Sequence, residues 1–263
     1  MRAIDQGLRA VFADGIRIFG KMKIGAVLFG AALFLGVPVA AEVVSARYEG
    51  ATARYPHGVL GDELEWERLV VEFSGGRERA VRWDSPVVFE DLAPRLWDMD
   101  GDGAAEVATI ESHEELGARL AFWKAEGDSL TAVAHLPWIG QRFRWLAPIG
   151  AADLDGDGMI EFAYIDRPHL ARVLRIWRYI PLAGGEVRLE EVTAISGLTN
   201  HRIGEDFISS GLRDCGDGPE LVTANADWSR VVLTSLLANG DARTRESGAF
   251  SAEHLADVLA CRA

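Results

Sequence analysis

The sequence has few cysteines, no run of basic residues after residue 25, and none of the short motifs of several large enzyme classes. GxSxG, Walker A and GxGxxG are absent, which argues against an α/β-hydrolase, a P-loop nucleotide hydrolase and a dinucleotide-binding enzyme. The segment SHEEL from Ser112 lacks the second histidine of a zinc protease motif. A formal net charge of −13, from 27 basic and 40 acidic residues, argues against a nucleic-acid partner, because phosphate binding needs a cationic patch. The same balance suits a protein that binds cations.

Residues 22 to 41, MKIGAVLFGAALFLGVPVAA, have the order of a secretory signal peptide. Lys23 opens the segment, an apolar stretch follows, and small residues end it. Cleavage after Ala41 leaves residues 42 to 263 as one exported domain, periplasmic or extracellular, with no membrane span. We interpret residues 1 to 41 as the signal-peptide region, with Met22 as a candidate start. An uncleaved anchor is the alternative.

Cys215 and Cys261 are the only cysteines. In an exported protein a pair of cysteines predicts a disulfide, here across an interval of 46 residues. Such a bridge contributes about 4 kcal/mol on the chain-entropy model. Two free thiols are the alternative.

Acidic loops and a set of arginines recur along the chain. DMDGDGAAE spans residues 98–106, DLDGDGMIE spans 153–161, and a faded third loop, RDCGDGPEL, spans 213–221. The first unit has no acidic triad at the corresponding place. An arginine that precedes an apolar run recurs with spacings of 51, 53 and 58 residues, at Arg68, Arg119, Arg172 and Arg230. The chain is therefore interpreted as four repeats of one unit.

Each repeat is predicted to be β-structure. The loops are followed by EVATIES, EFAYIDR and ELVTANA, runs rich in β-branched and aromatic residues, and later by turns that contain glycine. Units of this length with about four short strands are typical of propeller blades. We therefore expect an all-β fold, a small propeller-like array of about four blades, in which the strand from Glu42 closes the ring on the last blade. An open stack or a β-sandwich is the alternative.

The C-terminal segment SAEHLADVLACR breaks the β pattern. Ser251 can cap a helix, and Glu253 would lie in its first turn. Leu255, Val258 and Leu259 would share one face. We expect a short C-terminal helix that packs on the last blade, where the predicted disulfide would tie it to the faded loop.

Three carboxylates at alternating positions of a tight loop repel one another unless a cation is present, and glycines between them let the backbone turn so that they converge. Ca²⁺ takes about six to eight oxygen ligands from such groups. An EF-hand is excluded, because position 12 is Thr109 or Tyr164 rather than Glu and the flanks are strand-like. An acidic turn without metal is the alternative. We assign two structural Ca²⁺ sites, the first with Asp98, Asp100, Asp102, the carbonyl of Ala104 and Glu106, and the second with Asp153, Asp155, Asp157, the carbonyl of Met159 and Glu161.

The two full loops, together with the phrase IGAADLDGDG, resemble the FG-GAP/VCBS repeat family, the calcium-loop β-propeller repeats of integrin α-subunit heads. The resemblance covers most of residues 60 to 235. It implies calcium-stabilised structure and often a binding role, but no particular reaction. The chain departs from the family in having Glu at position 9, in a third loop with Arg213 and Cys215 in place of its first two acids, and in being too short for a seven-bladed ring. We expect no metal in the third loop.

Histidine and tryptophan are the remaining candidates for a site. We interpret the six histidines as solvated or structural, so no catalytic residue is assigned. Trp138 and Trp145 bracket IGQRFR, and an exposed pair would favour a sugar or peptide site, whereas packing between blades is the alternative. A deep pocket that joins His201, Glu205 and Asp206 would favour an enzyme.

The sequence thus predicts an exported calcium-binding interaction module whose partner is an unidentified protein or carbohydrate. A hydrolase or lyase on the same scaffold, with structural calcium, is the alternative.

Overall fold

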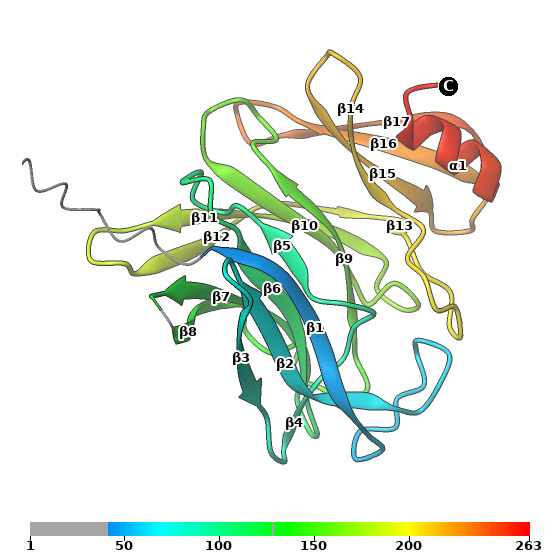
Figure 1. Cartoon of the computed structure of the whole chain (residues 1–263). Coiled ribbons are helices and arrows are strands. Elements are labelled where there is room, and N and C mark those ends of the chain that lie inside the picture. The colour runs from blue at the N-terminus through cyan, green and yellow to red at the C-terminus, as the bar shows by residue number, and fades with distance from the viewer. Residues whose placement is uncertain (1–41, 128) are drawn as a thin grey trace, which may run out of the picture. The chain divides into compact units, whose positions relative to one another are not determined.

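The structure, a computed structural model, describes residues 42–127 and 129–263. Strands dominate it, and one short helix lies at its C-terminal end (Figure 1). The all-β prediction with a short C-terminal helix is therefore confirmed. The predicted signal peptide lies outside the described residues. No helix within the described ranges is long and apolar enough to cross a membrane.

The first sheet contains eight strands, in the order β1-β2-β4-β6-β7-β8, with β3 beside β2 and β5 beside β6. A single residue pair, Trp66 with Phe89, joins β2 to β4 and so merges the first two repeats into one sheet. The strands are β1 (Val43–Thr52), β2 (Glu65–Phe73), β3 (Arg77–Arg82), β4 (Val87–Phe89), β5 (Arg95–Trp97), β6 (Glu106–His113), β7 (Gly117–Glu126) and β8 (Ser129–His135).

The second and third sheets correspond to the third and fourth repeats. The second has the order β12-β11-β10-β9, with β9 (Leu146–Ala152), β10 (Ile160–Asp166), β11 (Val173–Pro181) and β12 (Val187–Ser196). The third has the order β13-β15-β16-β17 with β14 beside β15. Its strands are β13 (Leu198–Thr199), β14 (Gly211–Asp214), β15 (Pro219–Asn225), β16 (Arg230–Leu236) and β17 (Ala242–Ala249). Among the residues described, the strands form three sheets, and no closed barrel or ring of sheets is found.

The expectation that the first strand joins the last repeat is wrong. Strand β1 pairs antiparallel with β2, from Val43 opposite Phe73 to Thr52 opposite Glu65. Val43 and Tyr48 are buried in the same apolar cluster as Phe73. The physical reason is chain connectivity, because closing the short connection between β1 and β2 costs less entropy than pairing the two ends of the domain.

Adjacent repeats bury apolar faces against each other. Phe122 of β7 contacts Phe162 of β10 edge to face, with ring centroids 4.9 Å apart, and Tyr179 of β11 at 5.4 Å. All three rings belong to one buried cluster that draws on the first and second sheets. Burial of this kind is the main favourable term in folding, and here it fixes the strands from which the acidic loops project.

Helix α1 (Ala252–Leu259) begins as predicted, with the side chain of Ser251 accepting a hydrogen bond from the backbone N–H of His254. Leu255 and Val258 are buried against Val222 and other apolar side chains of β15 and β16. Since the apolar residues lie on one face, the helix has a single way to pack on the third sheet. It lies beside β15 and β16 in Figure 1.

Candidate functional site

The first acidic loop folds around Asp98 and connects β5 to β6. The Asp98 carboxylate accepts hydrogen bonds from the backbone N–H groups of Gly101, at 2.8 Å, and Gly103, at 3.0 Å. Both glycines have positive φ, 73° and 87°, a conformation that side-chain-bearing residues rarely adopt. Asp102 in turn accepts from the N–H of Ala104 at 2.8 Å. The alternation of aspartate and glycine therefore produces a turn with its acids held in fixed positions.

The second loop repeats this pattern between β9 and β10. Asp153 accepts from Gly156 at 2.8 Å and from Gly158 at 3.0 Å, and Asp157 accepts from the N–H of Met159 at 2.9 Å. Two loops 55 positions apart in sequence thus share one hydrogen-bond pattern, which supports the interpretation of a true repeat.

A fully buried glutamate lies at the base of each loop. Glu106 accepts from the backbone N–H of Met99 at 2.8 Å, and Glu161 accepts from that of Leu154 at 2.9 Å. Burial raises the pKa of both carboxyls, and these hydrogen bonds and a nearby cation oppose the shift. The second oxygen of each carboxyl is thereby left to face the loop.

That second oxygen meets a cation from the neighbouring strand. In the first loop Lys124 of β7 lies 3.1 Å from Glu106 Oε1 and 3.1 Å from Asp102, and it also pairs with Asp100. Glu106 Oε1 is buried, and among the described residues the ammonium of Lys124 is its ion-pair partner.

In the second loop Arg178 of β11 takes the same place, directly opposite Glu161 in the strand register. Its guanidinium lies 2.7 Å from Asp155, 3.0 Å from Asp157 and 2.5 Å from Glu161. Neither cation was predicted from the sequence. Their signal was the alternation of side chains along β7 and β11, the second strand after each loop, which turns Lys124 and Arg178 toward the acids.

The loops pass a geometric test for a hard cation. Asp98, Asp100 and Glu106 each offer an oxygen within 4.8 Å of the others, and so do Asp153, Asp155 and Glu161. Asp102 and Asp157 lie outside these triads and contact the cation of the neighbouring strand. Each loop has four acidic side chains and one neighbouring cation. Negative charge is therefore in excess there and would still attract a divalent ion. The donor set is oxygen only, as Ca²⁺ prefers. The ligand roles given to the carbonyls of Ala104 and Met159 stay predictions.

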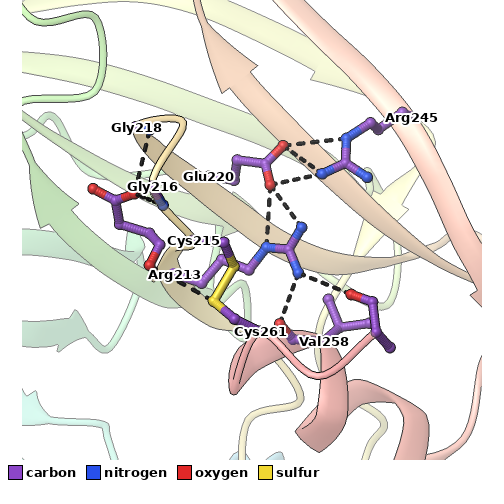
Figure 2. The surroundings of a disulfide bond; sticks show 10 residues. Arg213, Cys215, Gly216, Gly218, Glu220, Arg245, Val258 and Cys261 are labelled. Atoms are coloured by element: carbon purple, nitrogen blue, oxygen red, sulfur yellow. Dashed lines mark hydrogen bonds and ion pairs between the residues drawn. A yellow bond between two sulfur atoms is a disulfide. The ribbon is translucent and has the colours of Figure 1, made fainter.

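The third loop, residues 213–221, aligns with the other two by strand register in a way that differs from the sequence interpretation. Figure 2 shows its surroundings. Arg213 lies opposite Glu220 in the strand register, as Trp97 lies opposite Glu106. Asp214, not Arg213, therefore occupies the position of the first acid, and it accepts from the N–H groups of two glycines at 2.8 and 3.2 Å. The loop is shortened before Glu220, which a sequence comparison without strand register does not reveal.

Arg213 fixes this third loop to the C-terminal helix. Its guanidinium lies 2.7 Å from Glu220 and donates to the carbonyl of Val258 at 2.8 Å, while Arg245 lies 2.8 Å from the same Glu220 (Figure 2). The disulfide between Cys215 and Cys261, predicted from the sequence, lies beside this network. Arg213 and the disulfide thus hold this loop against the helix, and no acidic triad like those of the other two loops occurs here within the described ranges.

A separate cavity of about 290 Å³ is lined by residues of several repeats. Trp145 lines it and is only 2% exposed, and its indole N–H donates to the carbonyl of Glu90 at 2.9 Å. Trp138 is half-buried, with Arg119 stacked 4.1 Å above it. The exposed tryptophan pair considered from the sequence is therefore not formed.

Two histidines also line this cavity. His57 shares a hydrogen bond with the fully buried Glu90, whose other oxygen is bonded to Ser112. His169 bonds to His201 at 3.0 Å, and His201 bonds to the backbone carbonyl of Glu205 at 2.9 Å. A carbonyl only accepts, so His201 Nε2 donates and, in the neutral ring, His201 Nδ1 accepts from His169.

Burial is also the main cause of the histidine pKa shifts. It lowers the pKa of His169 to about 4 and lowers that of His201, which keeps both rings neutral. The pocket considered from the sequence around His201, Glu205 and Asp206 is not formed. The hydrogen bond of His201 goes to the backbone carbonyl of Glu205 rather than to its carboxylate.

Beneath the cavity lies a group of buried acids that the sequence analysis did not single out. Glu65, Glu90 and Asp91 are at most 2% exposed. Asp91 pairs with Arg95 and Glu90 with His57, whereas the described residues offer Glu65 no ion-pair partner. Burial, reinforced by Glu90, raises the pKa of Glu65 to about 10.

No family model matches this chain, and no curated protein matches it at a significant level.

Proposed function

We propose that this protein is an exported, calcium-stabilised binding module with two structural Ca²⁺ sites and about four propeller-like repeats. The observation that carries the proposal is the hydrogen-bond pattern that the two acidic loops share, each with a triad of carboxylate oxygens of which one belongs to a fully buried glutamate. In the first loop the buried Glu106 Oε1 accepts no hydrogen bond of ordinary geometry, and Lys124, 3.1 Å away, is its ion-pair partner among the described residues.

In each loop, backbone N–H groups orient the carboxylates, and the carboxylates would bind the ion. In each loop the two glycine N–H groups orient the first aspartate, and a further backbone N–H orients the glutamate. A bound Ca²⁺ supplies positive charge that offsets the repulsion among the acids. We assign it to Asp98, Asp100 and Glu106 in one loop and to Asp153, Asp155 and Glu161 in the other, with the remaining predicted ligands completing the shell.

The two sites are expected to differ in affinity because their cations differ. Lys124 is a single point charge on a flexible stem and can move aside, whereas Arg178 contacts three carboxylates through a planar fork. Calcium must compete with that fork, so the first loop should bind it more tightly than the second. The role of the ion in both is to fix the geometry of the turn between two strands.

Thermal unfolding with calcium and with excess chelator tests the proposal. Calcium at about a hundred times its Kd should stabilise the fold by about 2.7 kcal/mol per site. The double variant Asp98→Asn, Asp100→Asn removes the first of the two sites and should lose about half of the calcium-dependent stabilisation. Asp217→Asn, in the third loop that lacks a triad, is the matched control and should keep it. An identical melting temperature in calcium and chelator for the unsubstituted protein contradicts the proposal.

A hydrolase or lyase on the same scaffold is the second candidate. The observation that favours it is His57, which lines the cavity while a buried carboxyl, Glu90, fixes the orientation of its ring. Such pairs orient general bases in hydrolases. The test is hydrolysis of 4-nitrophenyl acetate. A rate that exceeds the buffer rate and falls at least tenfold in His57→Gln supports an enzyme, and a rate equal to buffer removes this candidate.

A further inference from the structure

The cavity near His57 is walled by apolar and aromatic side chains. Phe143 and Trp145 form part of its lining, and the ring of Phe143 stacks on His57 with centroids 5.1 Å apart. At its mouth Leu170 and Ile203 are 63% and 71% exposed. Apolar walls of this size with a few polar groups are typical of sites for small organic ligands.

The backbone around the cavity is held in unusual conformations. Phe143 has φ of 56° and Arg167 has φ of 48°, values that side-chain-bearing residues seldom adopt. The N–H of Phe143 donates to the buried hydroxyl of Tyr55 at 2.8 Å, which anchors the turn from a residue 88 positions away. Strained conformations that distant contacts hold in place are concentrated at binding sites.

One cation at the cavity lacks an acidic partner. The guanidinium of Arg144 donates to the carbonyl of Phe143 at 2.8 Å, and the described residues place no carboxylate within ion-pair distance of it. Arg167, by contrast, is bound by both oxygens of Asp166, at 2.8 and 3.0 Å. An unpaired arginine inside the lining of a cavity is unusual in a protein with a net charge of −13.

The acids beneath the cavity do not cancel this charge. Asp91 is neutralised by its ion pair with Arg95. Burial raises the pKa of Glu90, which favours a form of its pair with His57 that has no net charge. Glu65 is protonated at neutral pH, as its raised pKa requires. The local balance is therefore positive at Arg144.

We propose that this cavity binds a small organic anion, whose apolar group packs on Phe143 and Trp145 and whose carboxylate or phosphate pairs with Arg144. The proposal gives a ligand class to the binding role proposed above, but it does not depend on the calcium loops. The shared chemistry is an anionic group on a flat apolar body. The aromatic walls supply apolar contact, and the guanidinium supplies a charge-assisted hydrogen bond.

Isothermal titration calorimetry with phenylacetate and phenyl phosphate tests the proposal, with acetate and benzyl alcohol as probes that lack the ring or the charge. At least one aromatic anion should bind with a clear heat signal, and acetate and benzyl alcohol should bind at least tenfold more weakly. The stronger of the two anions distinguishes a carboxylate ligand from a phosphate ligand. Benzyl alcohol binding as tightly as both anions, or no binding of either anion, overturns the proposal.

Variants locate the binding. Arg144→Gln should weaken the anion about tenfold, the loss expected for one charge-assisted hydrogen bond. Ile203→Asp adds a negative charge at the mouth of the cavity and should also weaken anion binding. Because Ile203 is exposed, this substitution should not disturb the apolar core. Arg188→Gln, at an exposed arginine paired with Glu190 on β12, is the matched control and should bind as the unsubstituted protein does. Unchanged affinity in both Arg144→Gln and Ile203→Asp contradicts the site.

The titration is repeated in excess chelator, so that the two proposals fail separately. Anion binding with no calcium effect on melting removes the calcium proposal and keeps this one. A calcium effect on melting without anion binding removes the anion proposal and keeps the calcium proposal.

Discussion

The buried Glu65, which has no ion-pair partner among the described residues, should make the stability of this protein fall as pH rises, and Glu65→Gln should remove its share of that dependence. Glu65 begins β2, is 2% exposed, and has no ion-pair partner among the described residues. Its pKa is raised to about 10, first by burial and then by Glu90. In the unfolded chain the same carboxyl has the ordinary pKa of a glutamate, about 4.5.

The sign of this pH dependence follows from the number of protons that the folded and the unfolded chain bind. Above about pH 4.5 the unfolded chain has released the proton of Glu65, while the folded chain keeps it until about pH 10. Folding therefore takes up a proton, and the free energy of unfolding falls by about 1.4 kcal/mol per pH unit in this window. Below about pH 4.5 both states are protonated and the effect is absent. By pH 7.5 this one group costs about 4 kcal/mol.

Glutamine keeps the shape and removes the titration. Its buried amide costs about 1–3 kcal/mol if it finds no partner, so Glu65→Gln should be less stable than the unsubstituted protein at pH 5 and more stable at pH 8. The assay is urea unfolding at a series of pH values between 5 and 9. The exposed neighbour provides the control, because Glu63→Gln should leave the slope unchanged. Parallel curves for Glu65→Gln and the unsubstituted protein refute the reasoning.

Three other substitutions test separate parts of the structure. Cys215→Ser opens a loop of 46 residues and should cost about 4 kcal/mol in denaturant unfolding, whereas a reducing agent should lower the unsubstituted protein to the same level and leave the variant unchanged. Gly117→Ala, at φ 72°, would place a Cβ 2.2 Å from the carbonyl of Gln141 and should cost about 2 kcal/mol or more, and a stability equal to that of the unsubstituted protein would show that the turn is not rigid. Lys124→Met removes the cation of the first loop and should enlarge the calcium-induced rise in melting temperature; a smaller rise would mean that Lys124 assists the ion rather than competes with it.

Local patterns were enough to predict the loops and the helix. Aspartates alternating with glycines determine a turn by themselves, because the hydrogen bonds from Gly101 and Gly103 to Asp98 span only a few residues. The same holds for Ser251, whose cap bond reaches three residues ahead. Local hydrogen bonds of this kind are specified by adjacent sequence and do not depend on what packs around them.

The pairing of strands needed the tertiary structure. The partner of β1, the merging of the first two repeats through Trp66 and Phe89, and the register that puts Arg213 opposite Glu220 all depend on which segments meet. Each sequence segment is compatible with several neighbours, and burial of shared apolar faces selects among them. For the same reason Lys124 and Arg178 were recognised as loop cations only after their strands were aligned with the glutamates.

The sequence by itself determined the all-β class, the two acid-lined turns and the capped C-terminal helix, since each of these rests on neighbours in the chain. Only the tertiary structure decided where the cavity lies. Its Phe143 is anchored by Tyr55, 88 positions away, and its Trp145 by Glu90, 55 positions away. A cavity is the space left between side chains from distant segments, and its position depends on packing that no single stretch of sequence contains.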